Sequence, residues 1–163
     1  MSESVPTSLP HALLADAMLG ALARWLRALD LDVAYDPSID DPELAEKAAA
    51  ENRTLLTRDR RLLERRLARD RSMLIRSDRV EEQVRQVLDE LGVTPDPARL
   101  FRRCLRCNVP LETLPAEQAR SRVAPYVART QQEFRTCPSC GRVFWRGSHV
   151  GRMESWLKRS LGI

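Results

Sequence analysis

Three aspartates in the sequence each follow a short apolar run, and side chains of this type can bind a divalent cation. They are Asp16, Asp59 and Asp78, which come after residues 11–15, 53–58 and 72–77. Apolar runs of this length predict buried strands of a parallel sheet, because helical periodicity begins after each of them. Parallel strands deliver the residues that follow them to one edge of the sheet, where open α/β sheets bind ligands. We therefore expect the three carboxylates along one edge.

Clustered carboxylates suit the hydrolysis of a phosphodiester. Mg²⁺ and Mn²⁺ take oxygen ligands, activate a water molecule and stabilise the leaving oxygen. We expect Asp16 and Asp59 to bind such a cation directly, with Asp41 and Asp78 as further catalytic candidates. Thr57 is a candidate for orienting a water molecule at the same site.

Each aspartate also has a purely structural explanation, because a helix cap of this type is worth about 1 kcal/mol. Asp41 precedes Pro42 at the start of a helical pattern, which predicts Asp41 as the N-cap. Asp78 and Glu81 have the spacing of a capping box. Substitution of Asp by Asn separates the two explanations, since Asn caps as well as Asp but is a poor Mg²⁺ ligand.

Four cysteines form two pairs that suit a tetrahedral metal site. The spacing is C-x2-C-x29-C-x2-C, formed by Cys104, Cys107, Cys137 and Cys140. Asn108 and Gly141 follow the second cysteine of each pair, where the turn tends to need a positive φ. Two such turns supply the four thiolates of a structural Zn²⁺ site. Two disulfides, a redox pair and a mononuclear iron site are the alternatives, of which a cytosolic setting disfavours the disulfides.

The composition is that of a globular chain. With 163 residues and 43% hydrophobic residues, it fits one compact domain, or a domain of about a hundred residues with a small module. No apolar run approaches the ~18 residues that span a bilayer, so no membrane partner is expected. Residues 1–10 do not resemble a signal peptide. We expect them to form a short disordered leader, and we expect a cytoplasmic protein.

Charge is distributed unevenly along the chain. Residues 1–94 carry a net charge of −4 and residues 95–163 carry +8. An acidic body with a basic tail is typical of a nucleic-acid enzyme, so RNA is the expected partner. Arginine bias is the alternative explanation, because only two of the 27 basic residues are lysines.

Five side chains are candidates for contacts with nucleic acid. They are Arg24, Arg27, Arg142, Trp145 and Arg146. The first two lie near the polar face of the helix expected at 17–29, where solvation is the alternative. The other three belong to an alternating aromatic and basic stretch beside the second cysteine pair, in which Phe144 and Trp145 could stack on bases. The alternative is that these aromatic residues cover the thin core of the cysteine module.

The pattern of the chain predicts alternating strands and helices. Strands are expected at 11–15, 31–35, 54–57 and 73–75, and helices at 17–29, 41–51, 60–70 and 78–91. Repeated strand–helix units imply right-handed crossovers and a parallel sheet with helices on both faces. Gly92 is expected to end the last of these helices, and residues 95–99 to form a linker.

Three stretches of the chain resemble the Mut7-C family. They are Asp16 to Arg27 (DAMLGALARWLR), Leu55 to Asp59 (LLTRD) and Cys137 to His149 (CPSCGRVFWRGSH). The resemblance covers nearly the whole chain after the leader. It implies a PIN-like nuclease domain at 11–94, with a three-layer α/β/α fold around a parallel sheet. A small zinc ribbon with four cysteine ligands would follow at 100–163.

The resemblance also implies a chemistry, since PIN-like proteins bind Mg²⁺ or Mn²⁺ at an acidic cluster and hydrolyse RNA. It places Asp16 and Asp59 in that cluster and matches Asp41 to an acidic position of related PIN-like proteins. Asp78 lies where PIN domains often have a further acid. Asp30 stands where relatives often have a helix-ending glycine.

These features together predict a metal-dependent ribonuclease whose basic zinc ribbon aids RNA binding. One alternative is a non-catalytic RNA- or ribosome-binding adaptor that keeps the acidic edge for structure. Another is a toxin-like PIN protein with a protein antitoxin. Metal-dependent turnover distinguishes the nuclease from the adaptor.

Overall fold

Two β-sheets organise the chain in the computed structural model, which describes residues 11–65 and 71–162. The strands are β1 (Ala12–Ala15), β2 (Asp32–Tyr35), β3 (Thr54–Thr57), β4 (Ser72–Leu74), β5 (Glu112–Leu114), β6 (Phe134–Thr136) and β7 (Val143–Trp145). The α-helices are α1 (Gly20–Ala28), α2 (Asp41–Ala50), α3 (Arg60–Leu63), α4 (Val80–Leu91), α5 (Ala116–Ala119), α6 (Pro125–Thr130) and α7 (Ser148–Leu161), and η1 (Ala17–Leu19) and η2 (Pro97–Arg99) are 3₁₀-helices. The expected leader at 1–10 lies outside the described residues.

The first sheet is parallel, with the strand order β2-β1-β3-β4, and it is the middle of three layers. Alternate residues of its strands point to opposite faces. Leu13 and Ala15 of β1 join the core that α1 and α4 contribute to, whereas Leu14 packs with residues of α2 and α3 on the other face. The α/β class with a parallel sheet is therefore confirmed, and the four predicted strands lie within one residue of their expected bounds.

Helix starts differ from the expectations in their caps. Asp40, and not Asp41, caps α2, because its Oδ1 accepts a hydrogen bond from the Glu43 backbone N–H at 3.0 Å. The capping box predicted for Asp78 is wrong. The hydroxyl of Ser77 accepts from the Arg79 N–H at 3.1 Å instead, and α4 begins at Val80.

Two further helices differ in extent. The helix expected at 17–29 begins with η1 before α1 forms. The helix expected at 60–70 is present as α3 over Arg60–Leu63, and residues 66–70 lie outside the described residues. Gly92 ends α4 in the left-handed conformation, with φ of 64°, as predicted.

Two glutamines of α4 contact the backbone beside β4. The side chain of Gln86 accepts from the Arg76 N–H at 3.0 Å and donates to the Leu74 carbonyl at 2.7 Å. Gln83 donates to the Ser77 carbonyl at 2.9 Å. Both glutamines are buried, and these bonds satisfy polar groups where the chain leaves the last strand for the helix.

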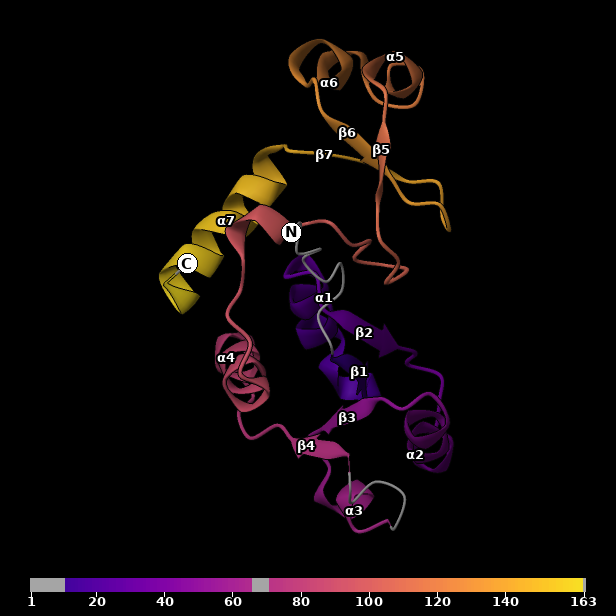
Figure 1. Ribbon diagram of the computed structural model, residues 1–163, viewed down its shortest axis with the longest axis vertical. Helices are drawn as coiled ribbons and strands as arrows, with labels where there is room; N and C mark the ends of the chain where they lie inside the picture. The colour runs from indigo at the N-terminus through magenta and orange to yellow at the C-terminus, as the bar shows by residue number, and fades with distance from the viewer. Residues whose placement is uncertain (1–10, 66–70, 163) are drawn as a thin grey trace, which may run out of the picture.

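The second sheet is antiparallel, with the order β5-β6-β7. It lies with α5 and α6 at one end of the molecule, and the parallel sheet lies at the other end (Figure 1). Leu114, Ala119 and Phe134 form a small core of their own there. None of the helices in the described ranges is long and apolar enough to cross a membrane.

The last helix, α7, packs against the first part of the chain, although it lies within the range expected to form the zinc-ribbon module. Trp156 stacks on Trp25 of α1 with 3.9 Å between ring centroids, and its Nε1–H donates to Glu81 of α4 at 3.3 Å. Leu157 is fully buried in the core of α1 and α4. The apolar stripe of α7 thus completes a core that begins with Leu13 of the first strand.

The expected linker at 95–99 is fixed to the end of α1. Asp30 has a φ of 68° and is buried, and its Oδ2 accepts from Nη2 of Arg99 at 2.8 Å. The conformation explains why a glycine suits this position. Here an aspartate adopts this conformation, and its carboxylate pairs with Arg99 and Arg103.

Because Leu157 is fully buried, Leu157→Ala should lower the free energy of unfolding by about 2–5 kcal/mol. The exposed neighbour Lys158 provides the control, and Lys158→Ala should change it by no more than about 0.5 kcal/mol. Chemical denaturation of both variants measures the difference. Equal stability would show that α7 does not pack as described.

Candidate functional site

The residues that follow the four parallel strands form one edge of the sheet, which we call the carboxyl edge. The chain leaves β1 for α1 on one face, and it leaves the neighbouring strand β3 for α3 on the other face. The point between β1 and β3 is therefore the topological switch point, where open α/β sheets bind ligands. Asp16 follows β1 at this point, and Asp59 follows β3 after Arg58.

Thr57 connects the two aspartates at the switch point. Its hydroxyl donates to Oδ2 of Asp16 at 2.5 Å and accepts from the Asp59 N–H at 3.0 Å. Asp16 also accepts from the backbone N–H groups of Met18 and Arg58, at 2.9 and 3.3 Å. Asp16 and Thr57 are buried, so this arrangement is held rigidly.

Both aspartates are also helix caps, as the structural explanation predicted. Asp16 caps η1, and Oδ1 of Asp59 accepts from the Arg61 N–H at 2.8 Å at the start of α3. Oδ2 of Asp59 forms no hydrogen bond with any residue of the described ranges. Capping therefore leaves one oxygen of Asp59 for another ligand.

The other acidic candidates lie along the same edge at greater distance from the switch point. Asp41 is exposed at the start of α2, and Asp78 is exposed before α4. Asp36, which we did not single out from the sequence, follows β2 beside β1. Hydrogen bonds from the hydroxyl and the N–H of Ser38 lower the pKa of Asp36. Its position directly after a predicted strand was the signal that could have identified it.

These carboxylates do not converge into a cage. Within the part of the chain that the structure describes, the four cysteines are the only group of three or more metal-binding side chains whose ligand atoms come together. Mg²⁺ does not need a cage, because proteins hold it through one or two carboxylates, with substrate phosphates and water as the other ligands. Asp16 and Asp59 match that requirement in type and in number.

An aromatic contact supports the edge beside Asp16. The hydroxyl of Tyr35 donates to the Ala17 carbonyl at 2.9 Å, which ties the end of β2 to η1. A Cβ at Gly20 would lie 2.8 Å from that hydroxyl oxygen, so a larger residue there would displace the Tyr35 ring from this contact. This explains the glycine of the Asp16 motif in structural terms.

The four cysteines predicted to bind zinc come together. We call Cys104, Cys107, Cys137 and Cys140 the cysteine cluster, and their Sγ atoms all lie within 4.8 Å of one another. A tetrahedron with Zn–S bonds of ~2.3 Å has S–S edges of about 3.8 Å. The Sγ atoms of Cys104 and Cys140 lie 4.0 Å apart, so the cluster has the size of a Zn²⁺ site.

The two cysteine turns have the same backbone geometry. Asn108 and Gly141 have φ of 63° and 70°, which confirms the positive φ expected after each pair. The N–H of Asn108 donates to the Cys104 carbonyl at 2.9 Å, and the N–H of Gly141 to the Cys137 carbonyl at 2.8 Å. Each turn therefore presents its sulfurs in the same way.

The thiols differ in how readily they ionise. Burial raises the pKa of Cys104 to about 11 and also raises the pKa of Cys107. A hydrogen bond from the Arg142 N–H lowers the pKa of Cys140 to about 7. Thiols must lose their protons when they ligate a metal, so metal binding should release protons at neutral pH.

Arg27 joins the first cysteine turn to the parallel sheet. Its Nε donates to the Val33 carbonyl at 2.8 Å, and its Nη1 donates to the carbonyls of Leu105 and Arg106 at 2.8 and 3.2 Å. Burial lowers the pKa of Arg27, and the negative charge of a Cys104 thiolate would counteract that effect. With 5% of its surface exposed, Arg27 is removed from the candidate phosphate-binding residues.

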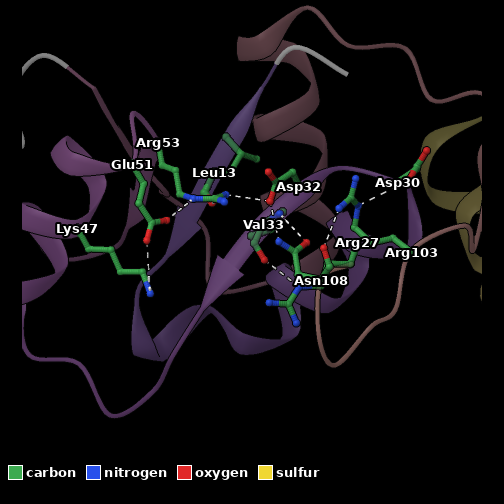
Figure 2. Close-up of polar contacts among 10 residues, drawn as sticks. All are labelled: Leu13, Arg27, Asp30, Asp32, Val33, Lys47, Glu51, Arg53, Arg103 and Asn108. Carbon is green, nitrogen blue, oxygen red and sulfur yellow. Dashed lines mark hydrogen bonds and ion pairs between the residues drawn. The ribbon is translucent and has the colours of Figure 1, made fainter. Parts of the chain in front are cut away.

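Asn108 makes a second connection at the same place. Its Oδ1 accepts from the Val33 N–H at 2.9 Å, and its Nδ2 donates to Asp32 at 2.6 Å. Figure 2 shows these contacts continuing from Asp32 through Arg53 to Glu51. Burial acts to raise the pKa of Asp32, but the hydrogen bonds from Arg53 and Asn108 outweigh it and lower the pKa.

The other candidates for nucleic-acid contacts differ in availability. Arg24 and Arg142 are exposed. Arg146 forms an ion pair with Glu154 at 2.5 Å. Trp145 packs against the small core of the antiparallel sheet, as the alternative explanation predicted.

Comparison with known proteins gives one match. The family model described as the Mut7-C RNAse domain matches residues 11–157. The match spans both sheets and most of α7. No curated protein and no solved structure matches the chain.

Because three backbone carbonyls depend on one buried guanidinium, Arg27→Met should lower the free energy of unfolding by about 2–4 kcal/mol. Arg24→Met is the matched control, since Arg24 is exposed on the same helix and should tolerate the change within about 0.5 kcal/mol. Urea denaturation measures both. An Arg27 variant as stable as the Arg24 variant would contradict the described contacts of Arg27 with β2 and the first cysteine turn.

Proposed function

The chain belongs to the Mut7-C RNAse domain family, and we propose on that basis that it hydrolyses RNA phosphodiester bonds with Mg²⁺ or Mn²⁺. The family describes a nuclease-type hydrolase with RNA as its substrate class. The metal dependence and the residues that perform the reaction are our proposal. A PIN-like assignment and a cytoplasmic location stay predictions from the sequence.

The position of Asp16 and Asp59 at the switch point carries this proposal. Their strands β1 and β3 are direct neighbours, and Thr57 contacts both residues. Helix capping explains each aspartate singly, but it does not explain why two acids and a buried hydroxyl share the place where this fold binds ligands. Metal-ligating carboxylates are commonly held by such hydrogen bonds from their neighbours.

We assign the roles from these contacts. Asp16 and Asp59 would hold the cation, which when bound supplies an activated water and stabilises the leaving oxygen. Thr57 positions Asp16 by donating to its Oδ2. Asp41, Asp36 and Asp78 lie along the same edge and would act on the cation through water at most. Arg58 and Arg60 are exposed beside Asp59 and can meet the phosphates of the substrate.

For the cysteine cluster we propose a structural Zn²⁺. The first cysteine turn contacts Asp32 and Val33 near the amino end of β2, whereas the acids follow the carboxyl ends of the strands. The zinc would thus take no part in the hydrolysis. It would stabilise a module whose own core has only three buried apolar residues among those described.

Asp59→Asn should remove cleavage and keep the fold, because Asn still caps α3 but is a poor cation ligand. We expect a rate loss beyond the ~10–100-fold that residues around a metal ligand typically cost. End-labelled single-stranded and structured RNA, incubated with Mg²⁺, Mn²⁺ or EDTA, measures it.

Asp89→Asn is the charge-matched control for that experiment, since Asp89 is exposed on α4 away from the carboxyl edge. It should cleave like the unaltered protein. An Asp59→Asn protein that is folded and fully active would refute the site. If no preparation cleaves RNA yet all bind it, the non-catalytic adaptor becomes the better explanation.

Removal of zinc should loosen the contacts between the first cysteine turn and β2 as well as the cysteine module itself. The Val33 N–H is protected by Asn108, so its hydrogen exchange should accelerate when a strong chelator strips the metal. Restoring Zn²⁺ should restore protection, and Mg²⁺ should not. If the exchange rate of the Val33 N–H does not change when the chelator is added, the cysteine turn keeps its shape without metal.

A further inference from the structure

A cavity of about 600 Å³ lies between the antiparallel sheet, the residues after the linker and α7. Its size falls within the ~300–1,000 Å³ of ordinary ligand pockets. Leu100 and Phe101 form one wall, and Val150 and Met153 of α7 contribute to another. None of the described acids of the carboxyl edge lines it, so it is separate from the site proposed above.

One face of the antiparallel sheet forms the opposite wall. Thr113, Arg135 and Phe144 lie side by side on the three strands, and all three line the cavity. Their strand neighbours Leu114 and Phe134 build the small core of the module and also reach the cavity. Phe144 belongs to none of the hydrophobic clusters of the described residues. Folding of the sheet therefore does not account for an aromatic ring at this position.

Among the charged side chains that line the cavity, Arg135 and Glu133 form no ion pair with any residue in the described ranges. Arg146 and Glu154 neutralise each other in an ion pair, and Arg103 is paired with Asp30. Arg135 is half-buried, and its side chain forms no hydrogen bond or ion pair with any residue in the described ranges. The cavity thus combines an aromatic ring with a guanidinium on the neighbouring strand whose donors are open to a ligand.

We propose that this cavity binds an unstacked base of single-stranded RNA. The base stacks on Phe144, and the adjoining phosphate meets Arg135. The net charge of +8 on residues 95–163 favours a polyanion over a neutral ligand. The choice of RNA rests on the proposed function, and it assigns to the antiparallel module the task of holding the substrate strand.

The test measures binding and needs no cleavage. Zinc-loaded protein without Mg²⁺ or Mn²⁺ is titrated into a fluorescein-labelled single-stranded RNA, and fluorescence anisotropy is recorded at several salt concentrations. Phe144→Leu keeps an apolar side chain and removes the ring, and Arg135→Gln removes the charge. Tyr126→Leu and Arg129→Gln make the same changes on exposed residues of α6 outside the cavity.

Phe144→Leu should weaken binding of the single strand about 5- to 100-fold. Arg135→Gln should weaken it and reduce the slope of log K against log salt by about 0.7, the value for one phosphate of a single strand. The two control variants should bind like the unaltered protein, and a blunt duplex of the same sequence should not distinguish Phe144→Leu from it.

Equal affinity of Phe144→Leu and the unaltered protein, with intact zinc content, would overturn the proposal and leave the cavity to a peptide or another ligand. An unchanged salt slope for Arg135→Gln would show that Arg135 does not contact a phosphate. Cleavage is assayed separately, so the two ideas fail separately. RNA binding that depends on Phe144 without any cleavage would refute only the hydrolytic function.

Discussion

The parallel pairing of β1 with both β2 and β3 is the constraint on which the rest of the structure depends. β1 has only four residues, but its register with the two neighbouring strands determines which side chains lie on either side of it. At its carboxyl end the pairing with β3 places Asp16 beside Thr57 and Asp59. On its other side the pairing with β2 presents Asp32 and Val33 to the first cysteine turn. One short strand thus positions both candidate metal sites, and it keeps them apart.

The contacts between β2 and the first cysteine turn are polar, and burying such groups is costly unless each donor and acceptor has a partner. Arg27 is buried and gives its donors to three carbonyls, and Asp32 receives hydrogen bonds from Arg53 and Asn108. Replacing all partners of such a buried polar network by apolar groups changes stability little, but removing or misplacing one partner is costly because it leaves the others unpaired. These polar contacts therefore define the orientation of the cysteine module more than they stabilise the fold. The apolar contribution comes from α7, through Trp156 and Leu157.

Those features that depend on local patterns could be predicted from the sequence. The strands follow from short apolar runs, the acids from their place after those runs, and the cysteine turns from spacing and from Asn108 and Gly141. Prediction failed where distant residues decide. The stacking of Trp25 on Trp156, the burial of Arg27 and the position of Phe144 on one sheet face all depend on partners far along the chain or on the register of β5, β6 and β7. The predicted caps of α2 and α4 were wrong for another reason. Asp40 and Ser77 stand one position before Asp41 and Asp78 and accept the capping hydrogen bonds instead.

The side chains beside β2 and β4 have one more consequence. A parallel sheet ends in two strands with unpaired N–H and C=O groups, and such edges can recruit strands from other chains. Gln86 contacts the Leu74 carbonyl of β4 and the N–H of Arg76 just after it, and Asn108 and Arg27 contact the N–H and the carbonyl of Val33 in β2. Side-chain amide and guanidinium groups here make the hydrogen bonds that a further strand would make at each edge. Because Asn108 belongs to a cysteine turn, the shape of that turn also decides whether the outer N–H of Val33 is covered or open to a strand of another chain.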